Sequence, residues 1–350
     1  MPNAGAVFSR PRTPAAKCLH LVRLNHIVTR SELVEATGLS QPTITRTVSA
    51  LIDAGLIQQR TDLTRSQGRG RPTIPLELAP NPRLHAGIAV GTSTTYIGLF
   101  DTRGRTIRDV EVPTPVARLS ESDFIEHVMA GLNRLRAGLD RPLVCVGVTT
   151  SGRVSPDGVV NAQNLGWQGA DVAGRLSYQF SVPVVVSGAV PAILGSEIQS
   201  TDLPTGTMAL FADDSLGAAI INDEGISQID LPESCEELTT EGVLCGRFPS
   251  LADAARAPEM RAALDQRARC LGDLTAKLAR DHGSSTVVVA GSAFIDDPAA
   301  PKLFASQVRS LLADIDVELR LIPTHQEIVR AIARAVALDQ LLREPLNLYP

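Results

Sequence analysis

The sequence lacks the features of a membrane-spanning or secreted protein. No apolar run reaches the roughly 18 residues that a helix needs to cross a bilayer. The first 17 residues contain no apolar stretch of the kind found in secretory signals. The five cysteines are odd in number and scattered along the chain, which argues against a disulfide framework. We therefore expect a cytoplasmic protein without membrane contacts.

The composition is that of a soluble globular protein with more than one domain. Hydrophobic residues make up 44% of the chain and charged residues 20%, and 350 residues exceed the length of one ordinary domain. The charge is unevenly distributed, because residues 1–79 hold 10 Lys and Arg against 5 Asp and Glu, whereas the remainder holds 23 against 33. A small basic domain on an acidic body suggests that polyanion contact is confined to the N-terminal end.

The N-terminal region carries the start and stop signals of three helices. The first is expected over residues 15–25. Thr29-Arg30-Ser31-Glu32 is a capping box that starts the second, and Gly38 supplies the turn that ends it, because a positive φ costs glycine little. Ser40 caps the third helix, where Pro42 in the first turn loses no intrahelical hydrogen bond. Two short helices joined by a turn indicate a helix-turn-helix, which places its second helix in the major groove of double-stranded DNA.

The third helix has one apolar and one polar face. Ile44, Val48, Leu51 and Ile52 recur at helical spacing and predict a buried stripe. The opposite face carries short hydrogen-bonding side chains and one arginine, which suit base edges and phosphates. We predict DNA contact for these residues, which are Gln41, Thr43, Thr45, Arg46 and Ser49. The alternative is an ordinary solvated helix face, but the cap, the turn and the basic segment that follows favour DNA contact.

A wing is expected after these helices. Segments 57–60 and 73–78 can pair as a hairpin around a basic tip, residues 65–72. Within that tip, Arg69-Gly70-Arg71-Pro72 resembles the core of an AT-hook, whose arginines enter narrow A·T-rich minor grooves. Arg69 and Arg71 are therefore predicted as further DNA contacts, with a flexible linker that carries incidental arginines as the alternative.

The remainder of the chain is expected to be an α/β body. Hairpin strands followed by alternating helices and strands occur twice, which indicates two related lobes. Strands are predicted at 86–90, 95–100, 106–112, 143–149, 182–186, 208–212, 218–222, 286–290 and 317–322. Helical segments are predicted at about 122–139, 189–199, 251–280 and 301–313. A last helix begins at a second capping box, Thr324 to Glu327, and its Ile328, Ile332 and Val336 are placed to pack on the body or on a partner.

These patterns predict a division into two domains. Residues 1–79 form the DNA-binding domain with its basic wing, and residues 83–350 form the body. Within the body, lobe one covers about 83–187 together with the last helix, 324–343, and lobe two covers about 188–323.

Three stretches carry a resemblance to a known family. They are Gly-Leu-Ser-Gln-Pro-Thr-Ile-Thr-Arg at 38–46, Gly-Arg-Pro at 70–72 and Val-Val-Asn-Ala-Gln-Asn-Leu-Gly-Trp at 159–167. With them the chain resembles the ROK family (repressor, open reading frame, kinase) from about residue 15 to 343. The resemblance implies a winged helix-turn-helix fused to a two-lobed, actin-like and ribonuclease-H-like body of the sugar-kinase type. It also implies a sequence-specific regulator, expected to be a repressor of carbohydrate or metabolic genes, that acts as a homodimer or higher homo-oligomer.

The resemblance also shows which enzyme motifs are altered. The family's Asp-x-Gly-Gly-Thr corresponds to residues 89–93, which begin with Ala89 and hold no carboxylate. Its Glu-Asn-Asp-Ala-Asn corresponds to residues 187–191, where Ala189 cannot act as a base. Its Gly-Thr-Gly corresponds to residues 213–215, where two carboxylates would repel a triphosphate. We therefore predict no enzymatic activity and no cofactor.

The zinc and sugar sites of the family are altered as well. The family's His and cysteine cluster would give tetrahedral ligation, but here only Cys235 and Cys245 fall in that region, with no histidine between residues 127 and 282, so no metal is expected. Asn164 and Trp167 remain as candidate ligand contacts, and Trp167 could equally be a packing residue. We expect an effector other than a free hexose, or no small ligand. The alternatives are a sugar-binding ROK protein with residual sensing or sugar kinase activity, and a sensor of a protein partner.

Overall fold

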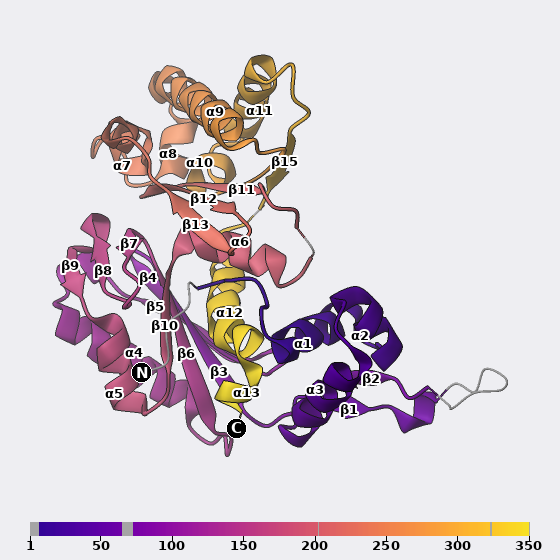
Figure 1. Ribbon diagram of the computed structural model, residues 1–350. Helices are drawn as coiled ribbons and strands as arrows, with labels where there is room; N and C mark the ends of the chain where they lie inside the picture. The colour runs from indigo at the N-terminus through magenta and orange to yellow at the C-terminus, as the bar shows by residue number, and fades with distance from the viewer. Residues whose placement is uncertain (1–6, 65–72, 202, 323, 350) are drawn as a thin grey trace.

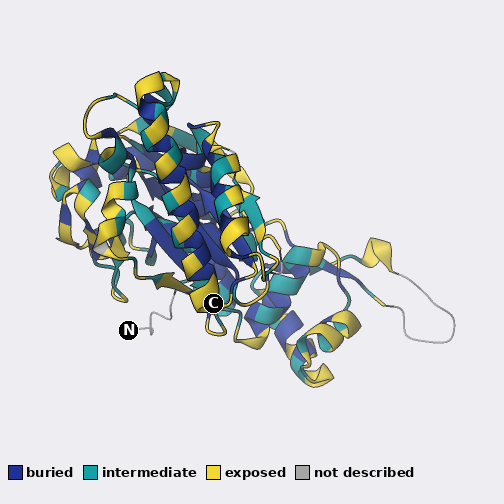
Figure 2. Cartoon of the chain, turned by 90° about the horizontal axis from the view of Figure 1, so that it is seen from above, coloured by how far each residue is buried: buried dark blue, intermediate teal, exposed yellow. Residues whose placement is uncertain are grey.

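The computed structural model describes residues 7–64, 73–201, 203–322 and 324–349, which form a small helical unit beside a two-lobed α/β body (Figure 1). We call the small unit, residues 7–64 and 73–79, the head. The strands of the body are largely buried, and the helices that cover them have exposed outer faces (Figure 2). Within the described residues, no helix is both long and apolar enough to span a bilayer.

The head contains the three expected helices, and its capping signals are confirmed. They are α1 (Pro14–Asn25), α2 (Arg30–Thr37) and α3 (Gln41–Asp53). At the start of α2, the Glu32 amide donates to the Thr29 hydroxyl at 3.3 Å and the Thr29 amide donates to the Glu32 carboxylate at 2.6 Å. Gly38 ends α2 with a φ of 66°, and the Ser40 hydroxyl accepts from the Thr43 amide at the start of α3.

The predicted apolar stripe of α3 forms the centre of the head. Ile44, Val48 and Leu51 are fully buried, and Ile52 is half-buried. The same core takes in residues from the far end of the chain, which are Leu338, Leu341, Leu342 and Tyr349. The head therefore does not have a core of its own, because it shares one with the last long helix of the body.

The predicted wing hairpin is present at its base and is shorter than expected. Strand β1 (Ile57–Gln59) pairs antiparallel with β2 (Leu76–Leu78). A 3-10 turn, η1 (Thr61–Leu63), follows β1, and Pro75, which has no amide hydrogen, precedes β2. These two features confine the ladder to three pairs of residues.

Lobe one contains a five-stranded sheet with the order β10-β6-β3-β4-β5. Its strands are β3 (Leu84–Val90), β4 (Thr94–Phe100), β5 (Thr106–Pro113), β6 (Leu143–Thr150) and β10 (Val184–Gly188). Alternate residues of β3 point to opposite faces, as the strand period requires. Leu84, Ala86 and Ile88 pack under α4 (Glu121–Arg136) and α5 (Val172–Phe180), whereas Ala89 faces the other side.

The other side of this sheet is covered by α12 (His325–Arg343), the last long helix. Glycines on two strands let it approach closely, because a Cβ at Gly87 would lie 2.1 Å from the Ala333 carbonyl oxygen and one at Gly147 would lie 2.4 Å from the Val336 carbonyl carbon. The predicted apolar positions Ile328, Ile332 and Val336 are buried here, so this helix packs on the body. Of the second capping box, only the bond from the Glu327 amide to the Thr324 hydroxyl forms among the described residues.

Lobe two repeats the topology of lobe one. Its sheet has the order β13-β12-β11-β14-β15, and in both sheets the first strand pairs antiparallel with the second and parallel with the fourth. The strands are β11 (Met208–Ala212), β12 (Leu216–Ile221), β13 (Ile226–Ile229), β14 (Thr286–Ala290) and β15 (Glu318–Leu321). One face packs on α6 (Ala189–Ile198) and the other on α9 (Arg261–His282) and α11 (Ala300–Leu311). The prediction of an α/β fold with two related lobes is confirmed.

Several short elements were not expected from the sequence. The region predicted as helical over 251–280 is divided, because Pro258 forces Ala257 into an extended conformation between α8 (Leu251–Arg256) and α9. A small sheet of β7 (Arg153–Val154), β8 (Val160–Ala162) and β9 (Trp167–Ala170) was missed, because its strands are too short to show a period. The remaining short elements are η2 (Val116–Arg118), η3 (Gln163–Leu165), η4 (Glu233–Leu238), α7 (Thr240–Leu244), η5 (Pro258–Met260), α10 (Ser292–Ile295) and α13 (Pro345–Leu348).

Candidate DNA-binding face and interlobe sites

The polar face of α3 is open to solvent. Gln41, Thr45, Arg46 and Ser49 are exposed, and Thr43 is half-buried. The Thr45 hydroxyl donates to the Gln41 carbonyl at 2.9 Å, and the Thr43 and Ser40 hydroxyls lie 2.8 Å apart. Both threonine hydroxyls therefore have a partner within the helix.

The other side chains of this face have no such partner. Within the described part of the chain, the side chains of Gln41, Arg46 and Ser49 form no hydrogen bond or ion pair. They are carried by a helix that has a capped start and whose Ile44, Val48 and Leu51 are fully buried on the opposite side. Polar groups without a partner on a rigid support are available to bases and phosphates. The face that the sequence predicts is thus presented outward, and its contact with DNA stays a prediction.

The base of the wing is held by a charge network. Arg60 bonds to Asp62 at 2.6 Å and to Glu77 at 2.8 Å. Burial raises the pKa of Glu77, but the hydrogen bonds from Gln58 and Arg60 outweigh it and leave the pKa below its ordinary value. The predicted tip, with the predicted contacts Arg69 and Arg71, lies outside the described residues.

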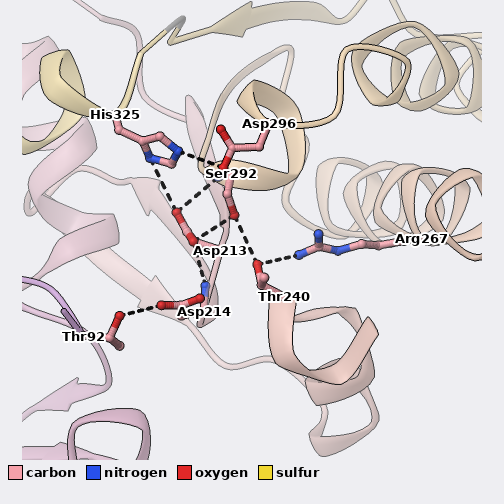
Figure 3. Close-up of polar contacts among 8 residues, drawn as sticks. All are labelled: Thr92, Asp213, Asp214, Thr240, Arg267, Ser292, Asp296 and His325. Atoms are coloured by element: carbon pink, nitrogen blue, oxygen red, sulfur yellow. Dashed lines mark hydrogen bonds and ion pairs between the residues drawn. The ribbon is translucent and has the colours of Figure 1, made fainter. Parts of the chain in front are cut away.

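The turns that correspond to the family's phosphate loops meet between the two lobes (Figure 3). Thr92, in the turn after β3, donates a 2.6 Å hydrogen bond from its hydroxyl to Asp214, in the turn after β11. The neighbouring Asp213 accepts from the amide of Ser292 at 3.2 Å and from its hydroxyl at 2.8 Å. A carboxylate of the chain itself therefore uses the donors at the start of α10.

Further charged groups surround Asp213. We call the eight residues drawn in Figure 3 the interlobe cluster, and they are Thr92, Asp213, Asp214, Thr240, Arg267, Ser292, Asp296 and His325. Burial and the nearby Asp214 raise the pKa of Asp213 above its ordinary value. His325, the first residue of α12, lies 3.8 Å from Asp213 and 3.5 Å from Asp296. Arg267 is buried, which lowers its pKa to about 10, and it donates to the Thr240 hydroxyl at 3.4 Å.

The sequence analysis named Asp213 and Asp214 only as carboxylates that would repel a triphosphate, and it did not place Arg267, Ser292 or His325 beside them. A signal existed for Ser292, because Gly291-Ser292 follows a buried strand at the edge where parallel strands end and ligands usually bind. No comparable signal marked Arg267, which lies in the middle of a long helix rich in arginine.

Beside the cluster lies a cavity of about 840 Å³ between the lobes. Among its described lining residues Arg153 is the single Lys or Arg, and it pairs with Asp230 at 2.7 Å. Five carboxylate side chains line the same space, and they are Asp214, Asp230, Glu236, Glu237 and Glu241. Such a lining disfavours phosphates and suits a neutral or cationic polar molecule.

The two candidate ligand residues are placed differently. Asn164 lines the cavity, and its side-chain oxygen accepts from the Ser151 hydroxyl at 2.8 Å. Trp167 is only 4% exposed and packs edge-on against Phe124, with ring centroids 4.9 Å apart. This placement supports the packing alternative for Trp167.

The sequence predicts no metal site, because only Cys235 and Cys245 fall in the region of the family's cysteine cluster. Cys235 is half-buried and Cys245 is exposed, and both are free thiols. Within the described residues, no group of three or more His, Cys, Asp or Glu is arranged to hold a metal ion.

Two further contacts hold the C-terminal part of the body, and the first of them ties it to the head. The Phe8 amide donates to the buried carboxylate of Asp339, on α12, at 2.8 Å. Near the C-terminus, the Tyr349 hydroxyl lies 2.8 Å from Nε2 of the buried His85 in β3. Helix α12 therefore joins the interlobe cluster at His325 to the shared core of the head at Leu338 to Leu342 (Figure 1).

Comparison with known proteins agrees with this architecture. A model of the ROK family matches residues 85–213. Two sequences, from Mycobacterium tuberculosis and Mycobacterium bovis, are each 30% identical to the chain over 95% of its length and 86% of theirs, and each is named a transcriptional regulator.

Solved structures share the fold. A ROK family transcriptional regulator described as a homolog of the E. coli MLC protein superposes with a TM-score of 0.72 at 17% identity, covering 94% of this chain and 98% of that one. The ROK hexokinase of Thermus thermophilus reaches 0.60 at 16% identity, but it covers 73% of this chain and 98% of its own. Because a relative of 30% identity covers 95% of its length and the ROK family model matches it, the chain belongs to the ROK family and is a ROK-type transcriptional regulator.

Proposed function

We propose that this ROK-type transcriptional regulator binds double-stranded DNA through the exposed face of α3. The observation that carries the proposal is that Gln41, Arg46 and Ser49 have no side-chain partner among the described residues, on a helix held from the opposite side by a buried apolar stripe. Arg46 would read a guanine or a phosphate, and the shorter side chains would contact base edges and phosphates beside it. Arg69 and Arg71 would add minor-groove contacts from the wing.

DNA binding is tested with the full chain and its own promoter region. Fluorescence anisotropy should show a preference for that region over random DNA, and the affinity should fall with rising salt as counterions are released. Equal, salt-insensitive affinity for both duplexes would refute the proposal. Because a transcriptional regulator binds chromosomal DNA, we propose that the protein is located in the cytoplasm.

We propose that the working form is a homodimer or a higher homo-oligomer on a roughly two-fold site. One recognition helix reads too few bases for useful specificity, so two heads are needed. Footprinting should reveal two half-sites whose centres are separated by whole helical turns, about 10 base pairs or a multiple. A single protected half-site together with a monomeric mass in solution would contradict this.

We propose that the regulator is a repressor of carbohydrate or metabolic genes. We propose also that its body is a sensor without phosphoryl-transfer activity. The Ser292 amide and hydroxyl are engaged by Asp213, and the acidic lining of the cavity disfavours phosphate groups. Coupled assays with ATP and a panel of hexoses should show no turnover. Turnover above that of an Asp213→Ala variant would instead favour a sugar kinase with an accessory DNA-binding domain.

We propose that residues 1–79 form the DNA-binding domain and residues 83–350 the sensor body. We propose further that α12 transmits the relative position of the two lobes to the DNA-binding domain. A ligand in the interlobe cavity would contact Asn164 and the carboxylates opposite and would change the angle between the lobes. Helix α12 would carry this change to the head, because His325 at its start contacts the interlobe cluster and its leucines pack in the core of the head. Neutral or cationic polar molecules that raise the melting temperature should also alter DNA affinity. A protein partner without any small ligand is the remaining candidate, tested by pull-down with the purified chain.

A further inference from the structure

A second pocket lies where the head meets the body, away from the cavity between the lobes. Its volume is about 450 Å³. Three separate elements bring arginines to it, namely Arg23 from α1, Arg103 and Arg105 from the turn between β4 and β5, and Arg334 from α12. Ser196 of α6 and Gln199, the residue that follows this helix, form another wall. Four arginines thus line one pocket from segments far apart in the sequence, and one of them, Arg103, donates to the Leu78 carbonyl oxygen.

Arg23 is poorly satisfied for a group so enclosed. Its Nε is buried and has no hydrogen-bond partner among the described residues, and one other nitrogen donates to the Gln199 carbonyl oxygen at a long 3.4 Å. Burial and then the charge of Arg334 lower the pKa of Arg23 to about 10, against the opposing charge of Asp101. A half-buried guanidinium that has an unpartnered nitrogen and lies beside a second cation favours an anion as a partner.

Arg334 and the turn shape the space around it. Within the described residues the Arg334 side chain forms no hydrogen bond or ion pair. Gly104 has a φ of 81°, and a Cβ there would lie 3.3 Å from both Arg23 Nη2 and Arg334 Cδ. Glycine at this position therefore leaves room between the two arginines.

The carboxylates nearby are already engaged. Glu77 lines the pocket but bonds to Gln58 at 2.6 Å and to Arg60 at 2.8 Å. Asp101 accepts from the backbone amides of Arg103 and Arg105, both at 2.9 Å, and so holds the turn. Among the described residues, neither forms an ion pair with Arg23 or Arg334.

We propose that this junction pocket binds a phosphate-bearing small molecule and is an effector site distinct from the interlobe cavity. Planar guanidinium groups bond phosphate oxygens in pairs. Within the described residues, the one acid that lines the pocket, Glu77, is paired with Arg60 and leaves Arg23 and Arg334 without a carboxylate partner. The volume is in the range of small-ligand sites. A DNA backbone is disfavoured as the occupant, because the walls belong to α6 and α12 of the body as well as to α1 of the head.

Occupancy would tie the head to the body. A bound phosphate would neutralise the repulsion between Arg23 on α1 and Arg334 on α12, and α1 packs in the same core as α3. The ligand would thereby restrict the orientation of α3. Anion binding itself does not depend on DNA binding, so the two proposals can fail separately.

The test titrates the full chain, without DNA, by isothermal calorimetry with inorganic phosphate, pyrophosphate and citrate at constant ionic strength in chloride. We expect phosphate and pyrophosphate to bind. Arg334→Met and Arg23→Met should each weaken binding by about tenfold or more, the equivalent of one charge-assisted hydrogen bond. Arg105→Met, at an exposed rim position that a folded chain tolerates, should weaken it less.

Two matched controls keep the outcome specific. Arg309→Met removes an exposed arginine on α11, and Lys17→Met removes a cation from a neighbouring pocket between α1 and lobe two. Both should bind phosphate as the wild type does. Unchanged affinity in Arg334→Met and Arg105→Met, equal losses in the controls, or binding of citrate alone would overturn the proposal.

A second measurement separates binding from folding and from DNA contact. Without phosphate, Arg334→Met should melt at the wild-type temperature or above, because a like charge has been removed. Added pyrophosphate should then shift the melting temperature of the wild type and of Arg309→Met, but not that of Arg334→Met. If no phosphate binds the free protein while Arg334→Met weakens DNA binding, the pocket contacts the DNA backbone and the proposal is wrong.

Discussion

The polar face of α3 and the interlobe cluster are both built from polar and charged side chains, yet they differ in what those side chains contact. On α3, Gln41, Arg46 and Ser49 have no partner among the described residues. Between the lobes, Asp213 and Asp214 are each bonded to hydroxyl groups of the chain. Unpartnered groups on a rigid support are suited to an outside ligand, whereas satisfied groups hold the protein together.

The largest expected effect comes from removing the support of the recognition face. Ile44→Ala should destabilise the head by about 2–5 kcal/mol, the cost of a cavity at a fully buried position, and should abolish DNA binding. Hydrogen exchange of α3 amides measures the loss directly. Ile52→Ala, at a half-buried position, should cost less, and equal exchange in the two variants would show that the buried stripe does not support the face.

Arg46→Ala tests direct reading by the face itself. It should cost about 1–3 kcal/mol of discrimination at one base position, without unfolding the head. Affinities for a set of single-base operator variants check this, with Arg309→Ala on the remote α11 as the control. A uniform loss across all operator variants would reassign Arg46 to phosphate contact.

The wing is tested by the pair Arg69→Ala/Arg71→Ala. Binding should weaken most at A·T-flanked sites, where a narrow minor groove attracts arginine. The salt slope should also fall by about 2, since each lost phosphate-neutralising charge lowers it by about 1. Equal weakening at G·C-flanked sites would favour the linker alternative for this segment.

Thr29→Ala should have a smaller effect, because it removes one helix cap and leaves the face intact. The head should lose about 1 kcal/mol of stability, with an unchanged order of preference among operators. Thr29→Ser keeps the hydroxyl and should restore the stability in chemical unfolding. An altered base preference in Thr29→Ala would mean that α2 takes part in recognition.

The smallest effect is expected from Asp213→Asn, which probes the satisfied cluster. Because the pKa of Asp213 is raised in the folded protein, the folded state holds this proton more tightly than the unfolded state. Its stability should therefore fall as the pH rises from about 4 through the folded-state pKa. The variant should lack this fall in melting temperature, whereas Asn at exposed position 223 should retain it. Matching pH profiles in the wild type and Asp213→Asn would place the source of the pH dependence elsewhere.

Much of the fold could be read from local patterns. The capping box at Thr29, the turn at Gly38 and the stripe from Ile44 to Leu51 depend on neighbours within a few residues, so the sequence was enough. The interruption at Pro258 was also readable, since proline constrains the residue before it, but it was passed over. The strands β7 to β9 were not readable, because two to four residues show no period.

The candidate sites also differ in whether local sequence patterns or contacts between distant residues define them. The exposed residues of α3 follow from helical spacing alone. The partners of Asp213 come from Ser292 and His325, which are distant in the chain and are brought together only by the two sheets. Trp167 was uncertain in the sequence because an aromatic side chain suits a ligand or a core equally, and only its packing against Phe124 favours the core.

What the sequence by itself determined is local and periodic: the head's helices, the alternation of the α/β body, the charge asymmetry and the residues absent from the kinase motifs. What only the tertiary structure decided is which distant groups meet. The head shares its core with the leucines of α12, and Arg23, Arg103 and Arg334 converge on one pocket. The physical reason is that capping and amphipathic spacing act over a turn or two of chain, whereas burial and charge contacts depend on distances in space that only the complete fold sets.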